Sequence, residues 1–271
     1  MGWKDRIPPS WRTTLRHARL RSLDLFHNLA SGSQSALPPP SLRTVGGGDF
    51  LAVGANNVRN LKRLTALDGK ALLEIGCGSG RNALALTTYD VRYCGVDIYK
   101  PYIDWCCGQI VPHFPNFTFL HADLYNGEYN PGGPTKADVY TFPLPAESFD
   151  LIFLTSVFTH MLKPEVQHYV AEIARMLKAG GNLYLTAFLV TDEARELIAA
   201  GRSTQRFTLS NGHFVVKPDL PEAAVGYEEP ILLDELRSHG LKVEAVKYGS
   251  WCGRKNYFDY QDVIFARRSE N

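Results

Sequence analysis

A short apolar run that ends in alternating glycines constrains the folding of this 271-residue chain more than any other feature. The run covers residues 71–75, three glycines follow at Gly76, Gly78 and Gly80, and a helix is expected over residues 82–88. Glycines let the backbone turn sharply and approach a ligand, and the N–H groups at the start of the following helix point toward whatever is bound. The sequence therefore predicts a ligand-binding loop between a buried strand and a helix.

The loop does not identify its ligand by itself. Residues 78–83 (GSGRNA) fit the dinucleotide pattern G-x-G-x-x-G/A, which keeps open an NAD-dependent oxidoreductase or a cofactor-binding module without activity. Glu74, two residues before the first glycine, suits a cationic ligand group better than a pyrophosphate. Asp97 follows a second apolar run, residues 91–96, at the place where a carboxylate can accept both hydroxyls of a ribose.

Apolar runs and helical patterns alternate along the chain, which indicates an α/β fold with a parallel sheet and helices on both faces. Two further strands near the C-terminus follow each other without a helix between them, so they are expected to pair antiparallel. We therefore predict a Rossmann-like, seven-stranded, mostly parallel sheet with an antiparallel last strand. The expected strands are residues 71–75, 91–96, 117–120, 150–154, 182–188, 243–248 and 263–267, and helices are expected over residues 164–177 and 231–239.

The chain divides into an N-terminal arm, residues 1–44, and a main domain, residues 45–271. The first 30 residues carry six basic side chains against two acidic ones, at a helical spacing of apolar residues, and a Ser/Pro-rich linker follows. This basic helix is expected to pack on its own domain or on a second copy, with contact to a membrane surface as the alternative. Residues 191–230 are an insertion with a predicted hairpin over residues 207–216, and they are expected to form a lid.

Composition excludes several classes of protein. The net charge of +1 is too small for a nucleic-acid-binding protein. The sequence has neither an apolar run long enough to cross a membrane nor a secretory signal pattern, and its five cysteines lack C-x-x-C spacing, so we expect a cytoplasmic protein without disulfides. No acid cluster marks a metal site, although a divalent metal is left open.

Five motifs in order resemble the class I S-adenosylmethionine-dependent methyltransferases over about residues 65–190. The motifs are EIGCGSG (74–80), GVD (95–97), ADL (122–124), SFDLI (148–152) and MLKAGG (176–181). The resemblance implies that the glycine loop cradles the methionine part of S-adenosylmethionine, that Asp97 binds its ribose and that Asp123 and Leu124 face its adenine. S-adenosylhomocysteine would be the product. The expected cofactor-binding residues are Glu74, Gly76, Cys77, Gly78, Gly80, Arg81, Asp97, Ile98, Asp123, Leu124, Ser156 and Val157.

A second resemblance concerns the acceptor. The segments SVFTHM (156–161), TVGGGDF (44–50), GSWCGR (249–254) and QD (261–262) look similar to bacterial methyltransferases associated with glycan and polysaccharide biosynthesis. This resemblance implies O-methylation of a sugar hydroxyl in a glycan, oligosaccharide or glycolipid precursor. A natural-product hydroxyl or amine is the alternative acceptor.

A hydroxyl acceptor must lose its proton during methyl transfer, so we searched for a general base. His160 lies four residues past Ser156, near the ligand-binding end of the fourth strand, and an ordinary histidine pKa suits this role. The alternative is a histidine that caps the next helix or packs under the cofactor. A carboxylate at Asp262 is the rival base.

The acceptor pocket is expected in the loops and the insertion outside the central sheet. Trp251, Arg254 and Tyr257 lie on one predicted loop, and aromatic faces beside a guanidinium suit a sugar ring or a nearby phosphate. Trp105 is expected to add another wall. The alternative is that these side chains only pack the loop.

Overall fold

The computed structural model describes residues 37–43 and 47–270. Almost the whole N-terminal arm, with its predicted basic helix, lies outside the described residues. Within the described part, none of the helices combines the length and hydrophobicity needed to cross a bilayer.

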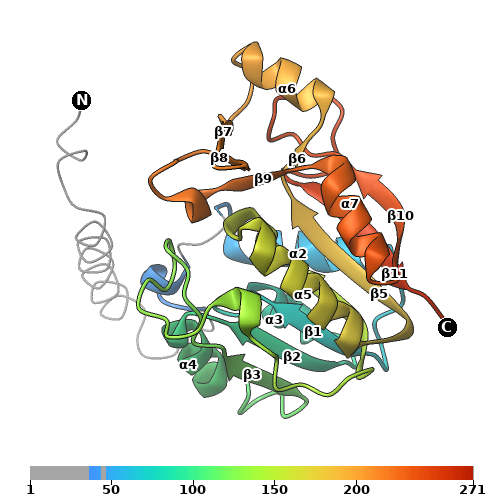
Figure 1. Cartoon of the computed structure of the whole chain (residues 1–271). Helices are drawn as coiled ribbons and strands as arrows, with labels where there is room; N and C mark the ends of the chain where they lie inside the picture. The colour runs from blue at the N-terminus through green and yellow to red at the C-terminus, as the bar shows by residue number, and fades with distance from the viewer. Residues whose placement is uncertain (1–36, 44–46, 271) are drawn as a thin grey trace.

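A seven-stranded sheet forms the centre of the main domain (Figure 1). Its strand order is β10-β11-β5-β4-β1-β2-β3, and all neighbouring strands from β5 to β3 run parallel. Strand β11 runs antiparallel to both β5 and β10, as the sequence predicted. The strands are β1 (Ala71–Ile75), β2 (Arg92–Asp97), β3 (Phe117–His121), β4 (Phe149–Leu154), β5 (Leu177–Ala187), β10 (Leu241–Lys247) and β11 (Asp262–Arg268).

Helices cover both faces of this sheet, which confirms the predicted α/β class. One face packs against α5 (Lys163–Met176) and α7 (Glu229–Ser238), and the other packs against α2 (Phe50–Leu61), α3 (Arg81–Leu86) and α4 (Lys100–Gln109). The alternation of side chains along β1 explains the two cores: Leu73 and Ile75 join the first, and Leu72 joins the second. Every residue of β1 is buried, as expected for a strand with helices on both sides.

The insertion after β5 folds into a small second sheet with its own apolar cluster. Its strand order is β6-β9-β8-β7, and the strands are β6 (Leu189–Val190), β7 (Thr208–Ser210), β8 (His213–Val215) and β9 (Val225–Glu228), with helix α6 (Asp192–Ala199) between β6 and β7. Asn211 and Gly212 both have positive φ, at 48° and 80°, as a two-residue turn between β7 and β8 requires. The predicted hairpin is therefore present, above one end of the large sheet in Figure 1.

Candidate functional site

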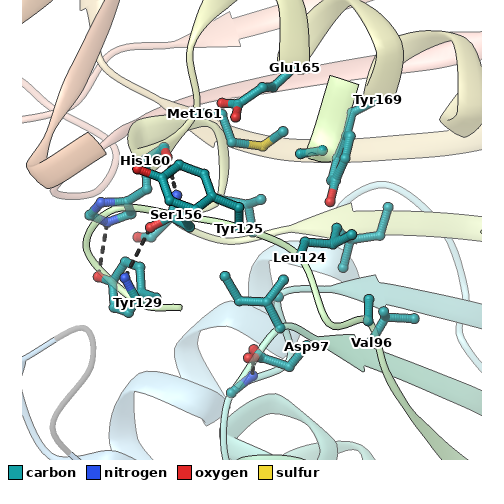
Figure 2. Close-up of a pocket in the computed structure, with 18 of the residues that line it drawn as sticks. Val96, Asp97, Leu124, Tyr125, Tyr129, Ser156, His160, Met161, Glu165 and Tyr169 are labelled. Carbon is teal, nitrogen blue, oxygen red and sulfur yellow. Dashed lines mark hydrogen bonds between the residues drawn. The ribbon is translucent and has the colours of Figure 1, made fainter. Parts of the chain in front are cut away.

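The carboxyl ends of β1, β2, β3 and β4 surround an apolar cavity (Figure 2). Parallel α/β sheets bind ligands at this edge, where the connections leave the strands. Aliphatic side chains from the ends of β1 and β2 and from the connections after β2, β3 and β4 form its walls, together with Phe142 and Tyr169. The aliphatic residues are Ile75, Val96, Ile98, Ala122, Leu124, Ala137 and Val157.

The glycine loop forms one side of this cavity. Gly76, Gly78 and Gly80 all have positive φ, a conformation that glycine adopts at little cost. A Cβ atom on Gly76 would lie 2.3 Å from Cγ2 of Val157, so the loop and the connection after β4 approach too closely for any other residue. Gly76 and Gly78 line the cavity, whereas Gly80 instead begins α3 and packs near Ile110.

Asp97 ends β2 and faces the same cavity. Its Oδ2 accepts a hydrogen bond from the backbone N–H of Gly78 at 2.8 Å, and its Oδ1 accepts one from Tyr99 at 2.9 Å. Burial raises the pKa of this carboxyl, and the backbone donors act against that rise. The carboxylate is therefore held in one orientation, with oxygen lone pairs left for a ligand.

Glu74 is a fully buried carboxyl in the middle of the sheet, only 1% exposed. Tyr93 donates its hydroxyl to Oε2 at 2.5 Å, and Asn82 donates its amide to Oε1 at 2.7 Å. Burial raises the pKa of Glu74 to about 7, and Asp97 adds to the rise, whereas the two hydrogen bonds and Arg81 oppose it. A cationic ligand group near this carboxyl would favour its ionised form.

A second cavity adjoins the first and has a volume of about 570 Å³. The two cavities share Gly76, Gly78, Tyr102, Thr155 and Ser156. Glu74, Cys77 and Arg81 line only the second cavity, at the side of the glycine loop. A further wall comes from helix α2, strand β5 and the segment before β11. The sequence did not single out as contacts the residues that form it, which are Phe50, Val53, Asn57, Tyr184, Thr186, Asp259, Tyr260 and Gln261.

Most of the predicted cofactor residues therefore meet at one place, but Gly80 and Asp123 line neither cavity. Leu124, the neighbour of Asp123, lines the first cavity, whereas the Asp123 side chain is exposed and accepts a hydrogen bond from Asn130 at 2.9 Å. Side chains alternate in direction along an extended segment, so only one of the two adjacent residues faces inward. The predicted adenine contact of the Asp123 side chain is not supported by this geometry.

His160 lies at the rim of the first cavity, in the short helix η4 (Phe158–His160). Its Nδ1 is 2.8 Å from the carbonyl oxygen of Glu222, and its Nε2 is 3.3 Å from the hydroxyl of Tyr129 (Figure 2). A carbonyl only accepts hydrogen bonds, so the proton of the neutral ring lies on Nδ1 and the lone pair lies on Nε2. Burial lowers the pKa of His160, which keeps the ring neutral.

The structure corrects the prediction that Asp262 is a base. Its side chain is 0% exposed and lines neither cavity. Its two oxygens accept hydrogen bonds from the N–H groups of Leu189 and Gly249, from Trp251 Nε1 and from Arg254. A carboxylate with this many donors and no access to a cavity connects parts of the fold and cannot reach an acceptor.

The four predicted substrate contacts also lie away from both cavities. Trp251 is 0% exposed, within the apolar cluster of the insertion. Arg254 is 7% exposed, and its guanidinium binds Asp262, Glu193 and Thr191. Trp105 lies in α4 and packs against the core, and Tyr257 is exposed outside the cavities. The structure therefore supports the packing alternative for Trp251, Arg254 and Trp105.

Metal ligands do not cluster in the part of the chain that the structure describes. Groups of three or more histidine, cysteine, aspartate or glutamate side chains arranged to hold a metal ion are absent there. The five cysteines are free thiols, and all but Cys107 are buried.

Comparison with known proteins finds a family profile that matches the central part of the chain. Residues 73–185, which are less than half of the chain, match the sequence profile of the family described as "Methyltransferase domain". This match runs from β1 to β5 and includes the glycine loop, Asp97 and His160. A solved methyltransferase structure from Methanosarcina mazei aligns with a TM-score of 0.55 at 21% identity, over 78% of this chain and 98% of that chain, which shows the same fold.

Curated relatives are also methyltransferases. The chain is 31% identical to 27-O-demethylrifamycin SV methyltransferase of Amycolatopsis mediterranei (strain S699), over 66% of this chain and 56% of that protein. It is 25% identical to probable thiol methyltransferase 2 of Arabidopsis thaliana, over 85% of this chain and 90% of that protein. Several matches are shorter: the chain spans 42% of phthiotriol/phenolphthiotriol dimycocerosates methyltransferase 1 of Mycobacterium ulcerans (strain Agy99), at 29% identity over 48% of this chain. Residues 73–185 therefore match a methyltransferase domain by sequence profile, and the chain shares its fold with a solved methyltransferase.

Proposed function

We propose that the protein transfers a methyl group from S-adenosylmethionine to a hydroxyl of a sugar, in a glycan, oligosaccharide or glycolipid precursor. The observation that carries this proposal is the lining of the second cavity, which joins the cofactor cavity and combines apolar surface with seven hydroxyl side chains, three carboxamides and the carboxyls of Glu74 and Asp259. Arg81 is the only lysine or arginine that lines either cavity among the described residues. Such a lining favours an uncharged acceptor with several hydroxyls over a phosphorylated or carboxylated one.

The residues of the first cavity fit the cofactor that the domain implies. The apolar walls suit the adenine ring, and the oriented carboxylate of Asp97 is placed to accept the ribose hydroxyls. Gly76 permits the close approach of backbone that a tightly held ligand needs. When bound, S-adenosylmethionine supplies a methyl group on a positively charged sulfur. The buried carboxyl of Glu74 lines the second cavity and favours positive charge there.

His160 remains our candidate for the general base. It lines only the first cavity, so this role requires the reacting hydroxyl of the acceptor to lie at the junction of the two cavities, beside Ser156. Its Nε2 carries the lone pair, and its lowered pKa keeps that lone pair available at neutral pH. The hydroxyl oxygen of Tyr129 lies 3.3 Å from this nitrogen, which is long for a hydrogen bond. An acceptor hydroxyl would replace this contact. A base in this position raises the rate by about 10²- to 10⁴-fold.

A natural-product hydroxyl or amine is the second candidate acceptor, and the hydroxyl is favoured by one relative, 27-O-demethylrifamycin SV methyltransferase. We also retain, as predictions, a cytoplasmic location, a lid role for residues 191–230 and a membrane or dimer contact for the N-terminal arm. An NAD-dependent reaction is disfavoured by the family match, although residues 78–83 fit the dinucleotide pattern.

Transfer of isotope-labelled methyl groups to an extract of the source organism tests the acceptor. We expect label in a product that glycosidases convert to methylated monosaccharides, and we expect the His160→Ala enzyme to transfer label at least 100-fold more slowly while it binds S-adenosylhomocysteine normally. Label that stays with protein or with a glycosidase-resistant small molecule would contradict the sugar acceptor. Near-normal transfer by His160→Ala would remove the base role.

A further inference from the structure

The position of the acceptor follows from how the two cavities join. Four of their five shared residues follow the carboxyl ends of β1 and β4, and the fifth, Tyr102, comes from α4. A ligand whose adenosine fills the apolar cavity must therefore pass this junction to reach the glycine loop side. The part of the second cavity beyond the junction lies between helix α2 and residues 259–261, and we call it the acceptor arm.

Three side chains are locked together where the acceptor arm meets the junction. Ser156 and Thr186 both donate their hydroxyls to Oε1 of Gln261, at 3.0 and 2.5 Å. The backbone N–H of Ser156 donates to Thr186 Oγ1 at 2.8 Å. Ser156 has a φ of 60°, a left-handed conformation that is uncommon for serine, so the surrounding contacts hold it there.

This arrangement fixes the direction of the Gln261 amide. Because its oxygen accepts two hydroxyls, its nitrogen and two N–H donors point away from them. None of the described residues accepts a hydrogen bond from this nitrogen, and the side chain lines the cavity. The acceptor arm therefore contains an oriented pair of donors next to the junction.

Asp259 supplies the complementary acceptor two residues earlier. Asn56 and Asn60 of α2 donate to its Oδ2 at 3.0 and 3.2 Å, and the N–H of Tyr260 donates to its Oδ1. These contacts hold the carboxylate against the wall of the second cavity. A hydroxyl both donates and accepts, so a donor at Gln261 and an acceptor at Asp259 match neighbouring hydroxyls of one neutral molecule.

We propose that the methyl acceptor binds in the acceptor arm and that Gln261 positions it by donating its amide hydrogen to an acceptor oxygen. This inference rests on the proposed methyl transfer and deepens it, because it places the acceptor and names a residue that favours oxygen nucleophiles. An ammonium group has no lone pair to accept this hydrogen bond, and a phosphate would meet the charge of Asp259.

Two variants of Gln261 distinguish its proposed role in positioning the acceptor from its contacts with Ser156 and Thr186. Gln261→Glu keeps an oxygen for Ser156 and Thr186 but removes the donors, whereas Gln261→Ala removes both. Gln167→Ala, at an exposed glutamine that bonds Glu235 on the surface, is the matched control. The assay is labelled methyl transfer from S-adenosylmethionine to the extract, measured from limiting to saturating extract.

Both Gln261 variants are expected to raise the extract concentration for half-maximal rate by about 3- to 10-fold, the effect of one lost hydrogen bond. The affinity of Gln261→Glu for S-adenosylhomocysteine is expected to stay within about twofold of the wild type, a margin well below one hydrogen bond. Gln261→Ala, which also loses the acceptor that holds Ser156 and Thr186, is expected to bind S-adenosylhomocysteine more weakly than Gln261→Glu. An unchanged half-maximal concentration for Gln261→Glu would overturn the inference. A raised value with a glycosidase-resistant product would overturn only the sugar acceptor, and no transfer by wild-type enzyme that binds S-adenosylhomocysteine would overturn both.

Discussion

Replacement of Asp262 by alanine is expected to lower the free energy of unfolding by about 3–5 kcal/mol. The carboxylate is fully buried and receives four hydrogen bonds, one from Arg254, whose own guanidinium is nearly buried. Removing it leaves that positive charge without its buried partner and leaves the indole N–H of Trp251 and two backbone N–H groups without acceptors. The loss is measured by urea unfolding with linear extrapolation.

The same cluster joins the insertion to the large sheet. Arg254 also binds Glu193 of α6 and Thr191, so one guanidinium connects the loop before β11 with the start of the insertion. Glu270→Ala, which breaks an exposed ion pair with Arg267, is the control and is expected to cost less than about 1 kcal/mol. A cost as small for Asp262→Ala would show that the buried cluster does not stabilise the fold.

The second large effect is a pH dependence that originates at Glu74. Its pKa is about 7 in the folded protein, against an ordinary value of 4.5, so the folded state binds the proton more tightly than the unfolded state. The bound proton stabilises the folded state, and this contribution to the free energy of unfolding is complete below about pH 4.5. It is lost as the pH rises through 7, and the total loss is about 3 kcal/mol. Glu74→Gln removes the ionisation and should become more stable, relative to wild type, as the pH rises from 5 to 8.

Urea unfolding of both proteins across this pH range measures the difference. Glu244→Gln, at an exposed position of β10, is the control and should track the wild type. A parallel consequence concerns binding. A positively charged sulfonium favours ionised Glu74, so the affinity for S-adenosylmethionine should rise through pH 7 more than that for S-adenosylhomocysteine, whose sulfur is uncharged. A stability difference between wild type and Glu74→Gln that does not change with pH would contradict the raised pKa.

Local patterns in the sequence were enough to predict the large sheet. Its strands are short apolar runs, and the Asn211–Gly212 turn has a strong local signature. Helix α2 was not predicted, because Gly54 and three asparagines weaken its helical pattern. It forms by packing on α3, where a Cβ on Gly54 would lie 2.4 Å from the carbonyl oxygen of Arg81.

The candidate site also divides into residues that local sequence motifs predict and residues that depend on tertiary packing. Gly76 and Asp97 belong to short motifs whose geometry is local, and both reach the cavity. Trp251 and Arg254 were assigned to a sugar surface because an aromatic ring beside a guanidinium looks the same in sequence whether it is exposed or buried. Gln261 and Asp262 are adjacent at the start of β11, and their side chains point in opposite directions. Gln261 therefore lines the cavity, whereas Asp262, the predicted base, is buried in the fold.

Calorimetric titration of the protein with S-adenosylhomocysteine and, separately, with NADH tests the central claim most directly, because the glycine loop fits both cofactor patterns. Methyltransferase function predicts saturable binding of S-adenosylhomocysteine at one site per chain, lost in an Asp97→Ala variant, and no heat from NADH. Tight binding of NADH without binding of S-adenosylhomocysteine would contradict it.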